Sequence, residues 1–343
     1  MNIQQMKDKI NSSEYNFLRN DNKLKNNIIL LTTGGSYAYG TNIDTSEHTS
    51  DFDVRGIFLN SKKELLTMNC YDKPIENRDL DCVIYPLKQI ITLLSNVNPN
   101  ILEILGTKEE HLFICTKEGR LLRDNTNIFL SKKVYASFGG YAIAQLRRLQ
   151  NALARDSYPQ AQKEKHILGS IEKQMLSFID RYKEFTENDL NLYISESDKE
   201  SYDYEIFIDI NLKHYPLRDL KGMYGEMTQV VNDYDCLNHR NSKKDQIHLL
   251  KHSMHLIRLL ITGTEILEGK GITTYREKDK DLLLDIRNGR YSYEEIFEMV
   301  DEYDKKFKYA GENSSLPVKP DYDKINQLVI KINQEVINNT YEI

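Results

Sequence analysis

The chain has 343 residues, of which 40% are hydrophobic and 29% are charged, and its formal net charge is −6. This balance is typical of a globular protein and excludes a disordered chain, and the length suits two domains of ordinary size. The net negative charge argues against a protein that coats nucleic acid by electrostatic attraction alone.

The sequence indicates no secretion signal, membrane span or disulfide framework. The first 18 residues lack the apolar run of a signal peptide, and no apolar stretch is long enough to cross a bilayer. The four cysteines show neither CxxC nor Cys/His spacing, so neither a disulfide framework nor a zinc site is predicted from them. We therefore expect a cytoplasmic protein without a membrane partner.

The first third of the chain alternates strand and helix patterns. Three runs rich in valine, isoleucine and aromatic residues predict strands; they are Asn26–Thr33, Asp51–Leu59 and Asp79–Tyr85. After the third run, apolar residues at three- to four-residue spacing predict a helix that starts at Leu87, stops near Pro99 and is followed by a second short helix. The alternation predicts an α/β unit, a mixed β-sheet flanked by helices, that reaches to about residue 128.

The rest of the chain has mainly helical patterns. Residues 131–154, 164–182 and 245–271 each carry apolar residues with a period of 3.6, and the last segment ends in Gly269 and Gly271, which are suitable helix stops. We therefore predict an α/β domain of residues 1–128, followed by a mainly α-helical domain of residues 129–343.

The turn that follows the first predicted strand has the sequence Gly34-Gly35-Ser36. A strand that enters a helix through such a turn directs backbone N–H groups at an anion, and glycine lets the backbone approach that anion closely. The Ser36 hydroxyl adds a donor or merely caps the helix. The turn alone is a weak indication of a phosphate site, since many Gly-Gly turns only reverse the chain.

Two aspartates that follow this turn strengthen the indication. On a strand, side chains at i and i+2 share a face, so Asp51 and Asp53 would project roughly 7 Å apart toward one site. Paired carboxylates suit Mg²⁺ or Mn²⁺, which complete their shells with phosphates and water. Asp81 is the preferred third carboxylate because it begins the next strand, and Asp79 is its rival.

The order of these residues resembles the motif of the nucleotidyltransferase superfamily that includes DNA polymerase beta. The segments GGSYAYGTN, SDFDVRGIFL, DCVIY and NPNILEIL narrow the resemblance to the bacterial and phage nucleotidyltransferases grouped as an RNA-repair-pathway, polymerase-beta-like family. The resemblance covers the N-terminal domain well and the helical half in patches. The gap between Ser36 and Asp51 is slightly longer than the motif allows, and the polar piece Ser46–Thr49 accounts for the excess.

The resemblance implies a role for each matching residue. Gly34, Gly35 and Ser36 would hold a nucleoside triphosphate, while Asp51, Asp53 and Asp81 would bind two Mg²⁺ or Mn²⁺ ions, with Asp81 activating the attacking hydroxyl. The reaction would transfer a nucleoside monophosphate in line and release pyrophosphate. Arg55 either contacts phosphate or pairs with an acidic neighbour.

A basic helix is the other candidate for nucleotide contact. In IHLLKHSMHLIR, Lys251, His255 and Arg258 lie along the edge of an apolar stripe, and the resemblance places such a helix across from the nucleotide. A solvated helix face is the alternative for Lys251 and Arg258. His248, His252 and His255 have a spacing that could ligate zinc, but the glutamate of a metalloprotease motif is absent.

The acceptor is less well indicated than the nucleotide. Between residues 131 and 175 there are eight basic residues against three acidic ones, interleaved with aromatics, a mixture that binds single-stranded RNA. Core residues at helical spacing are the alternative interpretation of the same aromatics. An RNA 3′ end resembling that of a tRNA is therefore the favoured acceptor, with a protein or small molecule as the alternative. A non-catalytic nucleotide-binding protein, such as a toxin–antitoxin or phage factor, is the competing class. The sequence indicates neither the nucleotide nor the oligomeric state.

Overall fold

The computed structural model describes residues 1–44, 49–68, 70–157, 190–196, 204–211 and 246–338, with isolated positions between 213 and 232. The chain forms two compact units: Met1–Leu146 together with Leu250–Ile343, and Arg147–Leu249. The first unit holds the sheet and the helices that follow residue 250. The predicted domain boundary between residues 128 and 129 stays a prediction.

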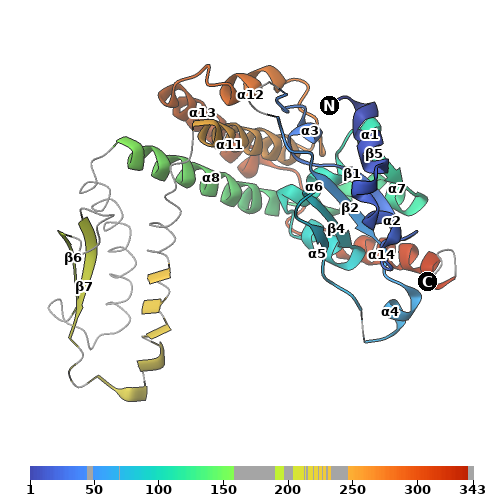
Figure 1. The fold of residues 1–343 in the computed structure, drawn as a ribbon, viewed down its shortest axis with the longest axis horizontal. Coiled ribbons are helices and arrows are strands. Elements are labelled where there is room, and N and C mark those ends of the chain that lie inside the picture. The colour runs from blue at the N-terminus through green and yellow to red at the C-terminus, as the bar shows by residue number, and fades with distance from the viewer. Residues whose placement is uncertain are drawn as a thin grey trace. The chain divides into compact units, whose positions relative to one another are not determined.

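A five-stranded mixed sheet lies at the centre of the first unit (Figure 1). Its strand order is β3-β4-β2-β1-β5. The strands are β1 (Ile28–Thr33), β2 (Val54–Phe58), β3 (Ile75–Asn77), β4 (Cys82–Pro86) and β5 (Leu112–Cys115). β2 and β4 pair in parallel, and the other pairs are antiparallel. The predicted mixed sheet with flanking helices is confirmed, although β3 and β5 were not predicted.

Side chains alternate between the two faces of the sheet and enter two separate cores. Leu31 of β1 and Ile84 of β4 enter the core beneath the N-terminal helices, whereas Leu30 and Ile57 enter the larger one. The N-terminal helices are α1 (Ile3–Asn11) and α2 (Phe17–Asn20), joined by a 3-10 turn, Ser13–Tyr15. The sheet is therefore covered on both faces.

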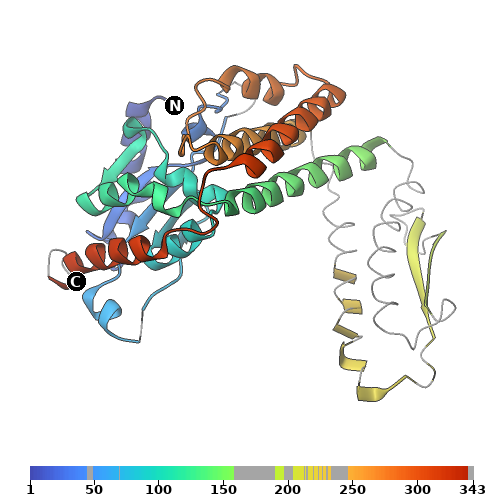
Figure 2. The ribbon, with the colours of Figure 1, turned by 180° about the vertical axis from the view of Figure 1, so that it is seen from behind.

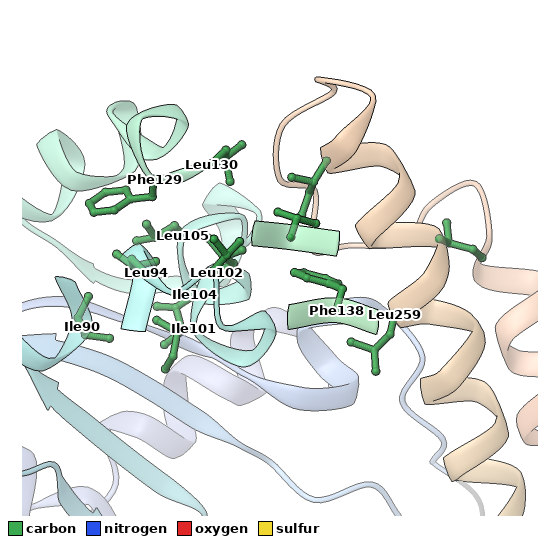
Figure 3. Packing of buried hydrophobic residues seen from close by; sticks show 14 of the residues in the cluster. Ile90, Leu94, Ile101, Leu102, Ile104, Leu105, Phe129, Leu130, Phe138 and Leu259 are labelled. Atoms are coloured by element: carbon green, nitrogen blue, oxygen red, sulfur yellow. The ribbon is translucent and has the colours of Figure 1, made fainter. Parts of the chain in front are cut away.

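The larger core joins the sheet to the later helices. The helices that follow β4 in the chain are α5 (Leu87–Ser95), α6 (Pro99–Leu105), α7 (Lys117–Asp124) and α8 (Lys133–Ser157). Figure 3 shows side chains from α5, α6, α8 and α11 (Gln246–Leu267) packed together, among them Leu94, Ile101, Phe138 and Leu259. A Cβ on Gly263 of α11 would come within 2.7 Å of Phe307, so this glycine permits close helix packing.

Three further helices of the first unit follow α11. They are α12 (Lys280–Arg287), α13 (Tyr293–Asn313) and α14 (Tyr322–Ile337). α14 lies beside the short helix α4 (Lys62–Leu66) and the 3-10 turn Thr126–Phe129 (Figures 1 and 2). A third 3-10 turn, Glu109–His111, precedes β5. The predicted helices at 131–154 and 245–271 are confirmed, and the one predicted at 164–182 lies outside the described residues.

The described part of the second unit includes one antiparallel hairpin of β6 (Leu190–Glu196) and β7 (Tyr204–Ile210). Tyr193 stacks on Phe207 with ring centroids 5.9 Å apart. Among the helices described in either unit, none combines the length and apolar content needed to cross a bilayer.

Candidate active site

The candidate site lies at the sheet edge where β1 ends and where β2 and β4 begin. β1 runs antiparallel to β2, and Thr33 pairs with Val54. β2 runs parallel to β4, and Val54 pairs with Cys82. The turn after β1 therefore meets the residues that precede β2 and β4.

Backbone hydrogen bonds connect these three segments directly. The Gly34 amide donates to the Asp53 carbonyl at 2.9 Å, and the Val54 amide donates to the Asp81 carbonyl at 3.1 Å. The Thr33 hydroxyl also donates to the Asp53 carbonyl, at 3.3 Å. The structure thus places the glycine turn beside Asp53, and Asp81 one strand away.

The glycines are required because the Asp53 and Arg55 side chains pack against the turn. A Cβ on Gly35 would lie 2.0 Å from Asp53 Oδ2, and one on Gly34 would lie 2.9 Å from Arg55 Cγ. Gly35 also has a φ of 56°, a conformation that disfavours other residues. Gly34 caps α3 (Gly35–Tyr39), in which Ser36 is buried, so the predicted strand–turn–helix is confirmed.

The aspartates lie before their strands, so the prediction that Asp51 and Asp53 are strand residues is wrong, and the prediction that both project toward one site stays a prediction. β2 begins at Val54, so both residues precede it, and Asp51 is exposed. Polar residues at the end of a strand run are commonly left out of the ladder, which local propensity does not reveal. Asp81 likewise precedes β4, is exposed, and has a φ of 45°. Asp79 is exposed too, so the choice between it and Asp81 stays open.

Asp53 is the most perturbed carboxyl group of the three. Burial raises its pKa, the charges of Asp81 and Asp51 raise it further, and the cations of Arg55 and Lys251 oppose the rise. The three carboxylates therefore lie near enough to repel one another, and Lys251 of α11 lies near enough to attract Asp53. A bound cation would relieve this repulsion.

Arg55 pairs with Asp53, which confirms one of the two roles predicted for it. Its guanidinium donates to Asp53 Oδ1 at 2.9 Å and to the carbonyl oxygens of Val54 and Asp81. These bonds orient the Asp53 carboxylate and join β2 to the turn before β4. Contact of Arg55 with phosphate stays a prediction.

Arg258 is buried and engaged by protein groups. It donates to the Glu103 carboxylate, which also accepts from the Tyr39 hydroxyl, and its guanidinium lies 3.7 Å from the centre of the Tyr39 ring. Burial raises the pKa of Glu103, and Arg258 opposes that rise. Arg258 thus links α11 to α3, and its contact with nucleotide stays a prediction.

The histidines of α11 form part of an electropositive region. The pKa of His255 falls well below its usual value because of burial first, and then because of Arg258 and Lys251. His252 Nδ1 lies 2.8 Å from Gln145 Oε1 of α8. Burial and these neighbouring cations therefore disfavour the charged form of His255.

The donor set suits an ion that takes few protein ligands. Among the described residues, no group of three His, Cys, Asp or Glu side chains is arranged to hold a metal ion. Asp51 and Asp53 nevertheless supply the hard oxygens that Mg²⁺ and Mn²⁺ prefer, and these ions take much of their shell from phosphates and water. The residues therefore fit Mg²⁺ or Mn²⁺ bound together with a nucleotide.

Sequence reasoning missed one arginine next to this site. Arg287, at the end of α12, is buried and donates to the Thr41 carbonyl and to Ser50 Oγ. The available signal was its position four residues after Leu283, on the buried face of the helix. A cation on an apolar helix face requires a polar partner elsewhere in the fold.

A mixed sheet that brings a glycine turn and acidic residues to one edge, beside a basic helix, is the arrangement of a polymerase beta-like nucleotidyltransferase. The family model described as the RNA repair pathway DNA polymerase beta family matches residues 6–331, and the chain belongs to that family. Searches of curated proteins and of solved structures found no match.

Proposed function

We propose that the protein transfers a nucleoside monophosphate from a nucleoside triphosphate to an acceptor hydroxyl, with an RNA 3′ end as the favoured acceptor. The observation that carries this proposal is the meeting of the Gly34-Gly35 turn with Asp53 and Asp81 at one sheet edge, through backbone hydrogen bonds. Family membership supports the general kind of reaction.

Each residue has a definite task in this proposal. Asp51 and Asp53 would hold two Mg²⁺ or Mn²⁺ ions, and Asp81 would share in that binding. When bound, such ions lower the pKa of the acceptor hydroxyl and neutralise charge on the departing phosphates. Arg55 keeps the Asp53 carboxylate oriented before substrate arrives.

The covalent step forms one bond and breaks another. The acceptor oxygen bonds to the α-phosphorus while the bond from that phosphorus to the oxygen bridging to the β-phosphorus breaks, and pyrophosphate leaves with the bridging oxygen. Asp81 accepts the hydroxyl proton. Ser36 and the turn amides receive the triphosphate, and Lys251 faces it from α11.

Two observations favour an anionic polymer as the acceptor. The segment from 131 to 175 has eight basic residues against three acidic ones, and the family name refers to RNA repair. Lys163, Lys165 and Lys173 lie outside the described part of the chain, so the support from this segment comes from sequence. Modification of a protein or small molecule is the alternative acceptor chemistry, and a non-catalytic nucleotide-binding toxin–antitoxin or phage factor is the alternative class.

The test incubates the protein with each labelled nucleoside triphosphate, Mg²⁺ or Mn²⁺, and total tRNA. We expect transfer of label to RNA by the wild type and none by the Asp51→Ala/Asp53→Ala variant. Asp79→Ala and Asp81→Ala form a matched pair, in which only Asp81→Ala should abolish transfer. The transferase proposal is refuted if label reaches neither RNA, nor protein, nor a small molecule. Full activity in the double variant would refute the metal site.

A further inference from the structure

Three arginines of the C-terminal part of the first unit are buried. Arg258, Arg276 and Arg287 are only 3% to 4% exposed. Arg258 pairs with Glu103, and the side chain of Arg276 pairs with Glu265 and Asp279. Among the residues that the structure describes, Arg287 differs because none of its hydrogen bonds goes to a carboxylate.

Arg287 bonds to both ends of residues 41–50, the segment between α3 and Asp51. One of its terminal nitrogens donates to the Thr41 carbonyl, and the other donates to Ser50 Oγ at 3.1 Å. Ser50 Oγ also accepts from the Ile43 amide at 2.8 Å, and the Ser50 amide donates to the Ile43 carbonyl at 2.9 Å. The guanidinium thus fixes both ends of residues 41–50.

Asp51 lies between two anchors. Ser50 before it is held by Arg287, and Phe52 after it is buried against the rings of Tyr37 and Phe113, with centroids 5.9 Å and 6.1 Å away. Asp51 itself is exposed and lies outside β2, so ladder bonds of that strand do not hold it. Its position therefore depends on its two neighbours.

The positive charge of Arg287 also interacts with the carboxylate of Asp51. Burial lowers the pKa of Arg287, and the carboxylate of Asp51 opposes that effect. A buried cation is costly unless it is hydrogen-bonded or paired. The buried guanidinium of Arg287 beside Ser50 therefore indicates a role beyond packing.

We propose that Arg287 is a positioning residue, which holds Asp51 at the sheet edge by joining Thr41 to Ser50. The inference rests on the proposed function, because it treats Asp51 as a metal ligand. Loss of Arg287 should weaken cation binding and lower kcat, with a smaller effect on the KM for nucleotide, because the hydrogen bonds of Arg287 go to Thr41 and Ser50, and its charge acts on Asp51.

The test measures Mn²⁺ binding to the nucleotide-free protein by electron paramagnetic resonance. The Mn²⁺ binding that remains in the Asp51→Ala/Asp53→Ala variant is subtracted from that of every other variant. Loss of a residue that orients a ligand typically costs about 10- to 100-fold in metal affinity, and we expect that loss in Arg287→Gln and a smaller one in Arg287→Lys. Arg290→Gln is the matched control, since Arg290 is exposed and pairs with the half-buried Asp285 of its own helix end, and its Mn²⁺ affinity should equal that of the wild type.

Hydrogen exchange at the amides of Ile43 and Ser50 gives a readout independent of metal. Both amides donate within the closed segment, so exchange should accelerate in Arg287→Gln and stay unchanged in Arg290→Gln. If Arg287→Gln fails to fold, Arg287→Lys and Ser50→Ala decide, because both keep the buried cation while weakening its bond to residue 50.

The outcomes separate this inference from the proposed function. If the wild type binds Mn²⁺ but transfers no nucleotide, the reaction is refuted, and weaker Mn²⁺ binding by the Arg287 variants still supports the positioning role. Wild-type Mn²⁺ affinity and amide exchange in folded Arg287 variants would overturn the inference. Absence of Mn²⁺ binding at Asp51 in the wild type would overturn it as well.

Discussion

Replacement of Gly35 by alanine tests the central contact of the site. The added Cβ would lie 2.0 Å from Asp53 Oδ2, whereas real Cβ contacts lie beyond 3.0 Å. The carboxylate or the turn must therefore shift by about 1 Å or more. Alanine at a φ of 56° adds backbone strain of about 1–2 kcal/mol.

A displacement of that size should affect activity more than folding. Misplacing a reacting group by about 1 Å can reduce the rate about 100-fold, so we expect Gly35→Ala to lower kcat/KM by about that factor. The unfolding free energy should fall by only about 1–2 kcal/mol, the cost of the strain. Single-turnover transfer and urea unfolding measure the two quantities.

Two further glycines serve as controls for this substitution. A Cβ on Gly34 would meet the flexible Arg55 side chain at 2.9 Å, and one on Gly140 of α8 would meet nothing within 4 Å. Activity should therefore rank Gly140→Ala at the wild-type value, Gly34→Ala below it, and Gly35→Ala lowest. Gly35→Ala with wild-type activity and Mn²⁺ affinity would refute the proposed role of the Gly35–Asp53 contact.

Two other predictions concern buried charges. Burial raises the pKa of Asp53, so the folded protein favours the protonated carboxyl. The stability that this group contributes is therefore present below its ordinary pKa of 3.8, and it is lost as the pH rises through the pKa of the folded protein. Metal-free Asp53→Asn should therefore gain stability over the wild type as pH rises above 3.8, by urea unfolding, and a pH-independent difference would contradict this reading. Arg258→Met should destabilise the fold by about 3–5 kcal/mol at neutral pH because Glu103 is left unpaired. The same unfolding assay should show a deficit that shrinks as the pH is lowered, because burial raises the pKa of Glu103 and favours its protonated form. A deficit that does not change with pH would show that the ion pair is not its cause.

The sequence predicted the parts of the site that are local in the chain. The Gly34-Gly35 turn, the later Asp51 and Asp53, and the periodic helix of Lys251 are each visible within a short window, because turn chemistry and helix period are local properties. The exact start of a strand is not local, since it depends on which residues find ladder partners, and β2 therefore begins later than predicted.

Long-range contacts lay beyond sequence reasoning. Arg287 is 246 residues from Thr41, and Arg258 is 155 residues from Glu103. No periodicity connects such positions, so an arginine on an apolar helix face indicated only that some partner exists. The three-residue strand β3 is likewise too short to give an alternation pattern.

The division of the first unit into two stretches of chain determines when the site can be completed during synthesis. The sheet edge with Asp53 and Asp81 is made early, whereas Arg287 is added 206 residues after Asp81. At translation rates of about 5–20 residues per second, that interval is roughly 10–40 s. A newly made chain would therefore carry its acidic residues for that time before Arg287 is added, so the contact between Arg287 and Ser50 could form only after that interval.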